Sequence, residues 1–242
     1  MRIIGIRPST RQFLGAICGT ALFLLVLSSV ILRSGESLPV YIQFHSHPQI
    51  IIDAGHGGID GGAVGIDNTV EKHINLAISL KLAELLQLNG FEVILTRSTD
   101  ASIHDPEIEG IARQKRSDMY NRKAVIDANP NALFLSIHQN LFQDPSCQGA
   151  QVFYSDNHAE SALLAQSIQD QFRESLQQSN SREIKAAGEN LFLLYNAQVP
   201  AVMVECGFLS NASECMLLQD EEYQKKIAFV IYLGLLDFYS QQ

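Results

Sequence analysis

Three titratable residues of this sequence, His56, His138 and Glu205, each stand at the end of an apolar stretch. Runs of β-branched and aliphatic residues of this length predict buried strands. The carboxyl ends of parallel strands lie along one edge of a sheet, so we expect the three side chains to converge there. A fourth group, Glu71, falls in the first turn of the helix expected after the first strand and therefore starts near the same edge. On its own, a carboxylate there is also explained by the helix dipole.

His56 lies within a loop rich in glycine. Gly55 precedes it and Gly57 and Gly58 follow it. Glycines permit positive φ angles and let other groups approach the backbone closely. Such a loop can present one side chain at the edge of a sheet. Taken alone, the segment is equally consistent with a plain strand-to-helix turn that carries an incidental histidine.

Two histidines and a carboxylate are a typical zinc-binding set that leaves one coordination position open for water. A second carboxylate beside such a site can act as a general base. The residues by themselves leave Asp53, Asp60 and Asp67 open as alternative ligands. The other histidines of the folded region are expected to be ordinary surface residues, and these are His73, His104 and His158.

The rest of the chain alternates predicted strands with predicted helices. Strands are expected over residues 50–54, 92–97, 133–138, 150–154, 191–195 and 200–205, and helices over 71–88, 111–128, 158–176, 213–218 and 222–239. This alternation predicts a single α/β domain with a mostly parallel, mixed sheet and helices on both faces. The many charges of the helix at 111–128 are expected to form a solvated face.

Four segments resemble the motifs of a known enzyme family, the zinc-dependent N-acetylmuramoyl-L-alanine amidases of amidase type 3. They are DAGHGG at 53–58, EK at 71–72, SIHQN at 136–140 and VECGFLSN at 204–211. The resemblance covers about residues 49–239. It implies hydrolysis of the amide between the lactyl group of muramic acid and the L-alanine of the stem peptide. It also implies that one zinc ion is bound by His56, Glu71 and His138, and that Glu205 is the catalytic base.

Some positions near these motifs need separate comment. Asn140, two residues past a ligand, is expected to bind substrate or support its loop. Gln139 stands where family members often have a small or apolar residue. Cys206 should point away from Glu205 by strand alternation, as a small buried hydrophobe. Residues 138–150 leave no room for the inserted helix that blocks the zinc in some relatives, so no built-in autoinhibition is expected.

The N-terminal region predicts a membrane anchor. Residues 13–32 are 20 residues without a charge, long enough to span a hydrocarbon core of about 30 Å. Three arginines precede this run, so residues 1–12 are expected in the cytoplasm. A linker at 33–48 and an extracytoplasmic catalytic domain at 49–242 follow. A cleaved signal peptide is the alternative, although its apolar region should be shorter.

Charge and cysteine content narrow the functional classes further. The chain has 17 basic and 26 acidic residues, and four of the basic ones lie in residues 1–33. The remainder is therefore strongly acidic, which argues against nucleic-acid binding by phosphate neutralisation. The four cysteines form no CxxC pair, so neither a disulfide framework nor a thiolate zinc site is indicated.

An anchor joined to a bare catalytic domain resembles the germination-specific amidases of the spore cortex. Those enzymes work with a peptidoglycan deacetylase to form muramic-δ-lactam. The expected partners are therefore peptidoglycan glycan strands and stem peptides, the membrane, and a deacetylase that acts downstream. Three alternatives stay open: a vegetative amidase for cell separation, a zinc peptidase acting on stem peptides, and an inactive peptidoglycan-binding module.

Overall fold

The computed structural model describes residues 49–242, which are built around a six-stranded sheet. The strands follow the order β2-β1-β3-β6-β4-β5. All neighbouring strands are parallel except β4 and β6, which are antiparallel. The predicted mixed, mostly parallel sheet is thereby confirmed. The strands are β1 (Gln49–Ala54), β2 (Glu92–Leu95), β3 (Leu133–Asn140), β4 (Gln151–Tyr154), β5 (Lys185–Ala186) and β6 (Ala201–Phe208).

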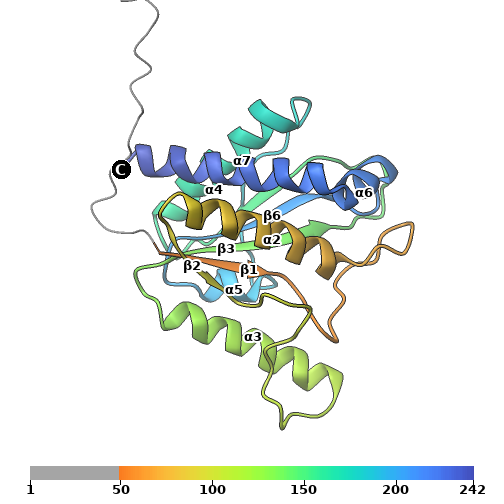
Figure 1. The fold of residues 1–242 in the computed structure, drawn as a ribbon, viewed down its shortest axis with the longest axis vertical. Helices are drawn as coiled ribbons and strands as arrows, with labels where there is room; N and C mark the ends of the chain where they lie inside the picture. The colour runs from red at the N-terminus through yellow and green to blue at the C-terminus, as the bar shows by residue number, and fades with distance from the viewer. Residues whose placement is uncertain (1–48) are drawn as a thin grey trace, which may run out of the picture. The chain divides into compact units, whose positions relative to one another are not determined.

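Helices cover both faces of this sheet. Figure 1 shows α2, α4 and α7 on one face and α3 and α5 on the other. A single π-helical turn, Phe172–Leu176, continues α4. The helices are α2 (Glu71–Leu88), α3 (Ile111–Asp127), α4 (Glu160–Gln171), α5 (Phe192–Asn196), α6 (Ala212–Gln219) and α7 (Glu221–Ser240).

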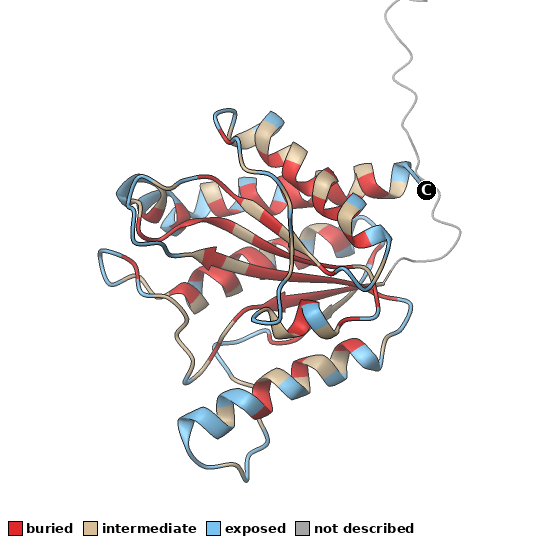
Figure 2. Cartoon of the chain, turned by 180° about the vertical axis from the view of Figure 1, so that it is seen from behind, coloured by how far each residue is buried: buried red, intermediate tan, exposed pale blue. Residues whose placement is uncertain are grey.

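Strand alternation divides the core into two clusters. Ile50 and Ile52 of β1 pack with the helices of the α2 face, whereas Ile51 packs on the α3 face. All three side chains are fully buried, and Figure 2 shows the central strands as the buried layer between the helices. A strand that is buried on both faces has consecutive apolar residues in its sequence, which explains the three isoleucines at 50–52.

Two expectations about these elements were wrong. Residues 191–195 do not form a strand, because Phe192–Asn196 is the short helix α5. A short apolar run does not distinguish a strand from a buried helix by its periodicity. The charges of α3 do not all lie on a solvated face either. The side chain of Arg122 is only 2% exposed and is ion-paired with Asp53 and Asp118.

Other differences concern the ends of elements. Strands β3 and β6 continue to Asn140 and Phe208, beyond the predicted ends, and the pairing between them shifts register between His138 and Asn140. The two-residue strand β5 had no clear signal in the sequence. Within residues 49–242, no helix is both long enough and apolar enough to cross a membrane. The predicted anchor at 13–32 and the linker at 33–48 lie outside the described residues.

Candidate metal centre

The loop after β1 holds His56 in an unusual backbone conformation. His56 has a φ of 62°, and Gly57 and Gly58 that follow also have positive φ angles. Non-glycine residues rarely adopt this conformation, and where they do the surrounding structure must hold them. Two arginines provide that support. Arg97 donates from Nε to the carbonyl of Ala54 (2.8 Å) and Arg122 donates from Nη2 to the carbonyl of His56 (2.7 Å).

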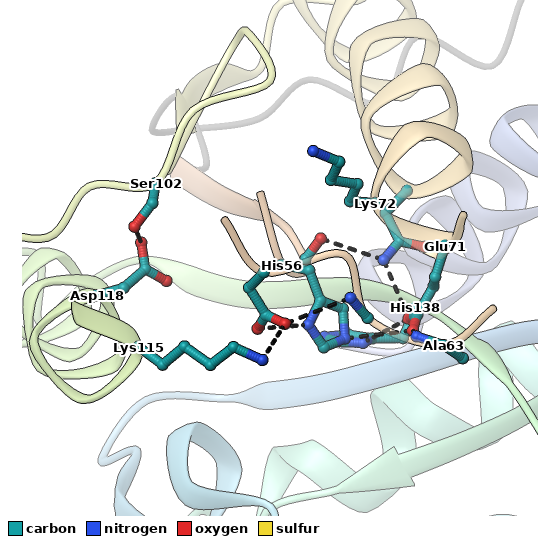
Figure 3. Close-up of polar contacts among 12 residues, drawn as sticks. His56, Ala63, Glu71, Lys72, Ser102, Lys115, Asp118 and His138 are labelled. Atoms are coloured by element: carbon teal, nitrogen blue, oxygen red, sulfur yellow. Dashed lines mark hydrogen bonds and ion pairs between the residues drawn. The ribbon is translucent and has the colours of Figure 1, made fainter. Parts of the chain in front are cut away.

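His56, Glu71 and His138 converge at the carboxyl edge of the sheet. One donor atom from each lies within 4.8 Å of the others. Nε2 of His56 is 3.2 Å from Oε2 of Glu71, and Nδ1 of His138 is 3.0 Å from Oε1. Figure 3 shows the three side chains pointing toward one another from the first loop, the start of α2 and the end of β3. The predicted convergence is thus present in the structure.

These residues fit a zinc ion. Two imidazole nitrogens and a carboxylate are donors that zinc accepts readily. The backbone around them is also shaped for close approach. A Cβ at Gly55 would lie 2.2 Å from Nε2 of His138, and one at Gly62 would lie 2.5 Å from Oε2 of Glu71. Only glycine at these two positions leaves room for the donor groups.

Glu71 is held firmly by hydrogen bonds to both of its carboxyl oxygens. Oε2 accepts from the backbone N–H of Ala63 at 2.8 Å, and Oε1 accepts from the N–H of Gln139 at 3.0 Å. Burial alone would raise the pKa of Glu71, but its contacts with His138 and His56 hold that pKa well below its usual range. Glu71 is therefore an ionised carboxylate, as a metal ligand must be.

The carboxylate of Asp60 orients the ring of His56 from the side that faces away from Glu71. Oδ2 of Asp60 is 2.8 Å from Nδ1 of His56, while Oδ1 is 2.7 Å from Nζ of Lys115 on α3. This leaves Nε2 of His56 directed at Glu71, as in carboxylate–histidine pairs behind bound metals. Burial works against the charged ring, yet the hydrogen bonds with Asp60 and Glu71 raise the pKa of His56 to about 9.

The three aspartates that sequence reasoning left open as ligands lie outside the cluster. Asp60 contacts the far nitrogen of His56. Asp53 is buried against Arg122. Asp67 accepts hydrogen bonds from Cys215 and Gln219 instead. The remaining histidines of the folded region also lie outside it, and these are His73, His104 and His158.

Glu205 lies beside this cluster. It is at the same register position as His138 on the neighbouring parallel strand. Its Oε2 atom is buried and accepts no hydrogen bond from any residue in the described range 49–242. Burial raises the pKa of Glu205 to about 7. A carboxylate is suited to general-base chemistry when its pKa lies near neutral pH and one of its oxygens is free of hydrogen bonds from the described residues.

Asn140 and Cys206 occupy distinct places near the cluster. Asn140 ends β3, where its backbone carbonyl accepts from the N–H of Leu209 at 2.8 Å. Cys206 is fully buried in the core cluster of the α2 face, and burial raises the pKa of its thiol. The alternation predicted for Glu205 and Cys206 therefore agrees with the structure. Residues 141–150 contain no helix, as the shortness of that segment predicted.

Several supporting residues were not identified from the sequence. Arg97, Arg122 and Lys115 act on the first loop from distant elements, so no local pattern points to them. Asn75 does have a signal, because it lies four residues after Glu71 and hence on the same face of α2. A cavity of about 290 Å³ adjoins the cluster, and His56, Lys115, His138, Phe192 and Met203 are among its lining residues.

The family model for N-acetylmuramoyl-L-alanine amidases, Amidase_3, matches residues 50–237. The chain belongs to this amidase family. The amidase is 36% identical over 193 residues to the germination-specific N-acetylmuramoyl-L-alanine amidase of Bacillus subtilis, a match that covers 80% of each protein. It is 31% identical over 192 residues to the amidase LytC of the same organism, covering 78% of this chain but 35% of LytC.

Solved structures show the same fold. The CwlD amidase of Clostridioides difficile, solved in complex with the GerS lipoprotein, is 43% identical to this amidase with a TM-score of 0.78. That match covers 81% of this chain and all of the CwlD chain. The catalytic domain of CwlV from Paenibacillus polymyxa is 29% identical, with a TM-score of 0.65 over 81% of this chain and 99% of that one. The predicted resemblance to germination-specific amidases is confirmed by these matches.

Proposed function

We propose that this amidase uses one zinc ion, held by His56, Glu71 and His138, to cleave the lactyl–L-alanine amide of peptidoglycan. The observation that carries the proposal is the convergence of their three donor atoms within 4.8 Å. A bound zinc ion supplies Lewis acidity, which polarises a carbonyl and lowers the pKa of water. The three aspartates near the loop are engaged elsewhere, so the ligand set matches the one that the family resemblance implies.

In this mechanism Glu205 moves the proton. Its carboxylate takes a proton from the attacking water and passes it to the alanine nitrogen as the carbon–nitrogen bond breaks. The products are a lactyl carboxylate on the glycan and a free amine on L-alanine. Asp60 and Lys115 keep the ring of His56 in place throughout, because their contacts are made from outside the cluster. Asn140, at the end of β3, is assigned to binding the substrate or supporting the adjoining loop.

We further infer that the biological substrate is the spore cortex. The support is the 36% identity to a germination-specific amidase over 80% of both proteins. The freed lactyl carboxylate is the group that a lactam ring requires, and a deacetylase would supply the amine partner to form muramic-δ-lactam. The predicted anchor at 13–32 would hold the catalytic domain on the extracytoplasmic side of the membrane. Because the CwlD relative was solved with a lipoprotein, a lipoprotein partner is proposed here as well.

The experiment that tests these proposals is a digestion of purified peptidoglycan. The full-length chain is loaded with zinc and incubated with cortex and vegetative walls, beside a Glu205→Gln control, and products are identified by mass spectrometry. Stem peptides beginning with L-alanine and glycan with intact lactyl acids are expected from cortex. Equal cleavage of both walls would favour a vegetative role, and cleavage only within stem peptides would indicate a peptidase. A zinc-loaded chain that is inert alone but active with a lipoprotein would establish an activating partner. Inertness under all conditions would indicate a binding module.

A further inference from the structure

Behind Glu71 lies a buried amide side chain, Asn75, which is fully inaccessible to solvent. Its Nδ2 donates to Oε1 of Glu71 at 3.1 Å and to the backbone carbonyl of Gly55 at 3.2 Å. Asn75 therefore contacts both a proposed metal ligand and the loop that carries another, His56. The side-chain amide of Asn75 thus connects the start of α2 with the loop after β1.

The orientation of this amide is determined by its partners. A carboxylate and a carbonyl can only accept hydrogen bonds, so both must face the NH₂ group of Asn75. Its Oδ1 atom is then turned away from Glu71 and, being buried, needs a donor. Gln139 provides that donor, because its Nε2 lies 3.1 Å from Oδ1 of Asn75.

Gln139 is not explained by packing. Gln139 is only 3% exposed, and its Oε1 atom accepts no hydrogen bond from the described part of the chain. A buried polar atom without a partner is unfavourable, and an apolar side chain of similar size would fill the same space. The side chain of Gln139 donates to Oδ1 of Asn75 and also lies within hydrogen-bonding reach of the thiol of Cys206.

We propose that Gln139 is a positioning residue that acts through Asn75 to hold the carboxylate of Glu71 in the orientation that binds zinc. This inference rests on the proposed metal centre. Without the donor of Gln139, Oδ1 of Asn75 is a buried acceptor that has lost its hydrogen bond, and the amide is held on one side only. Its hydrogen bonds to Oε1 of Glu71 and to the carbonyl of Gly55 are then less firmly oriented. The backbone N–H of Gln139 still contacts Glu71, so the effect is partial.

The test is a double-mutant cycle read by zinc affinity. Full-length wild type, Gln139→Met, Asn75→Ala and the double variant are titrated with zinc against a chromophoric chelator, and cobalt absorption spectra are recorded. Partners behind a metal ligand typically contribute 10–100-fold to affinity. We expect Gln139→Met to weaken zinc binding about 10-fold. Asn75→Ala should weaken it by at least as much, and the double variant should equal Asn75→Ala. The cobalt spectrum of Gln139→Met should shift, which a loss of stability alone would not produce.

Ser79→Ala is the matched control. Ser79 lies one turn further along α2, is buried, and its hydroxyl has no partner among the described residues, so this variant should bind zinc like wild type. Melting of the metal-free proteins checks folding, and Gln139→Ala replaces Gln139→Met if the latter does not fold. Unchanged zinc affinity and cobalt spectrum in the Gln139 variant would overturn the proposal, as would additive losses in the double variant. If wild type binds no zinc, the proposed metal centre itself is wrong and this inference fails with it.

Discussion

His138 and Glu205 occupy the same register position on the neighbouring parallel strands β3 and β6. The backbone hydrogen bonds between β3 and β6 therefore set the distance between His138, a proposed ligand, and Glu205, the proposed base. Strand ladders are among the least mobile parts of a fold. His56 lies on a loop, but His138 and Glu205, which must act on one substrate, are placed by the sheet itself.

Replacing Glu205 by Gln should separate catalysis from metal binding. The amide cannot take up a proton, and general-base groups typically contribute about 10²–10⁴-fold to rate. Amidase activity should fall by a factor in that range, while zinc content measured by elemental analysis should stay at wild-type level. A variant that loses its zinc would show instead that Glu205 is a ligand.

Asp60→Asn should weaken zinc binding without unfolding the protein. The carboxylate of Asp60 is 2.8 Å from Nδ1 of His56, and losing such a partner typically reduces metal affinity about 10–100-fold. Chelator competition measures the change. Asp67→Asn is the matched control, since Asp67 lies on the same loop but contacts Cys215 and Gln219. Equal losses in both variants would mean that general loop distortion, not the contact with His56, causes the effect.

Arg122→Met should be strongly destabilising. Arg122 is ion-paired with Asp53 and Asp118 and is almost entirely buried, so its removal leaves buried carboxylates without their partner. Breaking a buried pair typically lowers the free energy of unfolding by about 3–5 kcal/mol. Lys123→Met, which removes a more exposed pair with Asp127, should lower it by less than about 1 kcal/mol. Urea unfolding of the metal-free proteins measures both values, and similar values would contradict the assignment.

Stability should decline in acid because of Asp53. Burial alone would raise its pKa, but Arg122 and the hydrogen bonds from Ser136 and Thr96, together with the charge of His138, hold that pKa below its usual range. A lowered folded-state pKa stabilises the protein above the unfolded-state value of about 3.9, and this contribution is lost as pH falls through the folded-state pKa.

Urea unfolding of the metal-free protein at a series of pH values between about 5 and 2 tests this contribution of Asp53. Asp53→Asn should be less stable at neutral pH and should show a shallower decline. Parallel curves for wild type and variant would assign the acid sensitivity to other carboxylates.

The sequence predicted the elements that bear the cluster better than the residues that support it. Three apolar strands with titratable residues at their ends, and a carboxylate at a helix start, point to His56, Glu71, His138 and Glu205 as candidates. Those local patterns left three aspartates of the first loop and strand open as ligands, and the structure places these outside the cluster. Arg122 and Lys115 could not be assigned, because a charged residue on a helix has the same local pattern whether its face is solvated or buried. The strand predicted at 191–195 failed for a related reason, since a run of five residues is too short to show a period.

The position of β6 in the sheet has a consequence for how the amidase is made. This strand is the last in the chain, yet it lies between β3 and β4 near the middle of the sheet. A ribosome completes β6 only after every other strand, so a chain that stops before it carries the three proposed zinc ligands but neither Glu205 nor the link between the two halves of the sheet. Such a shortened chain would be unable to cut cell wall through the proposed site.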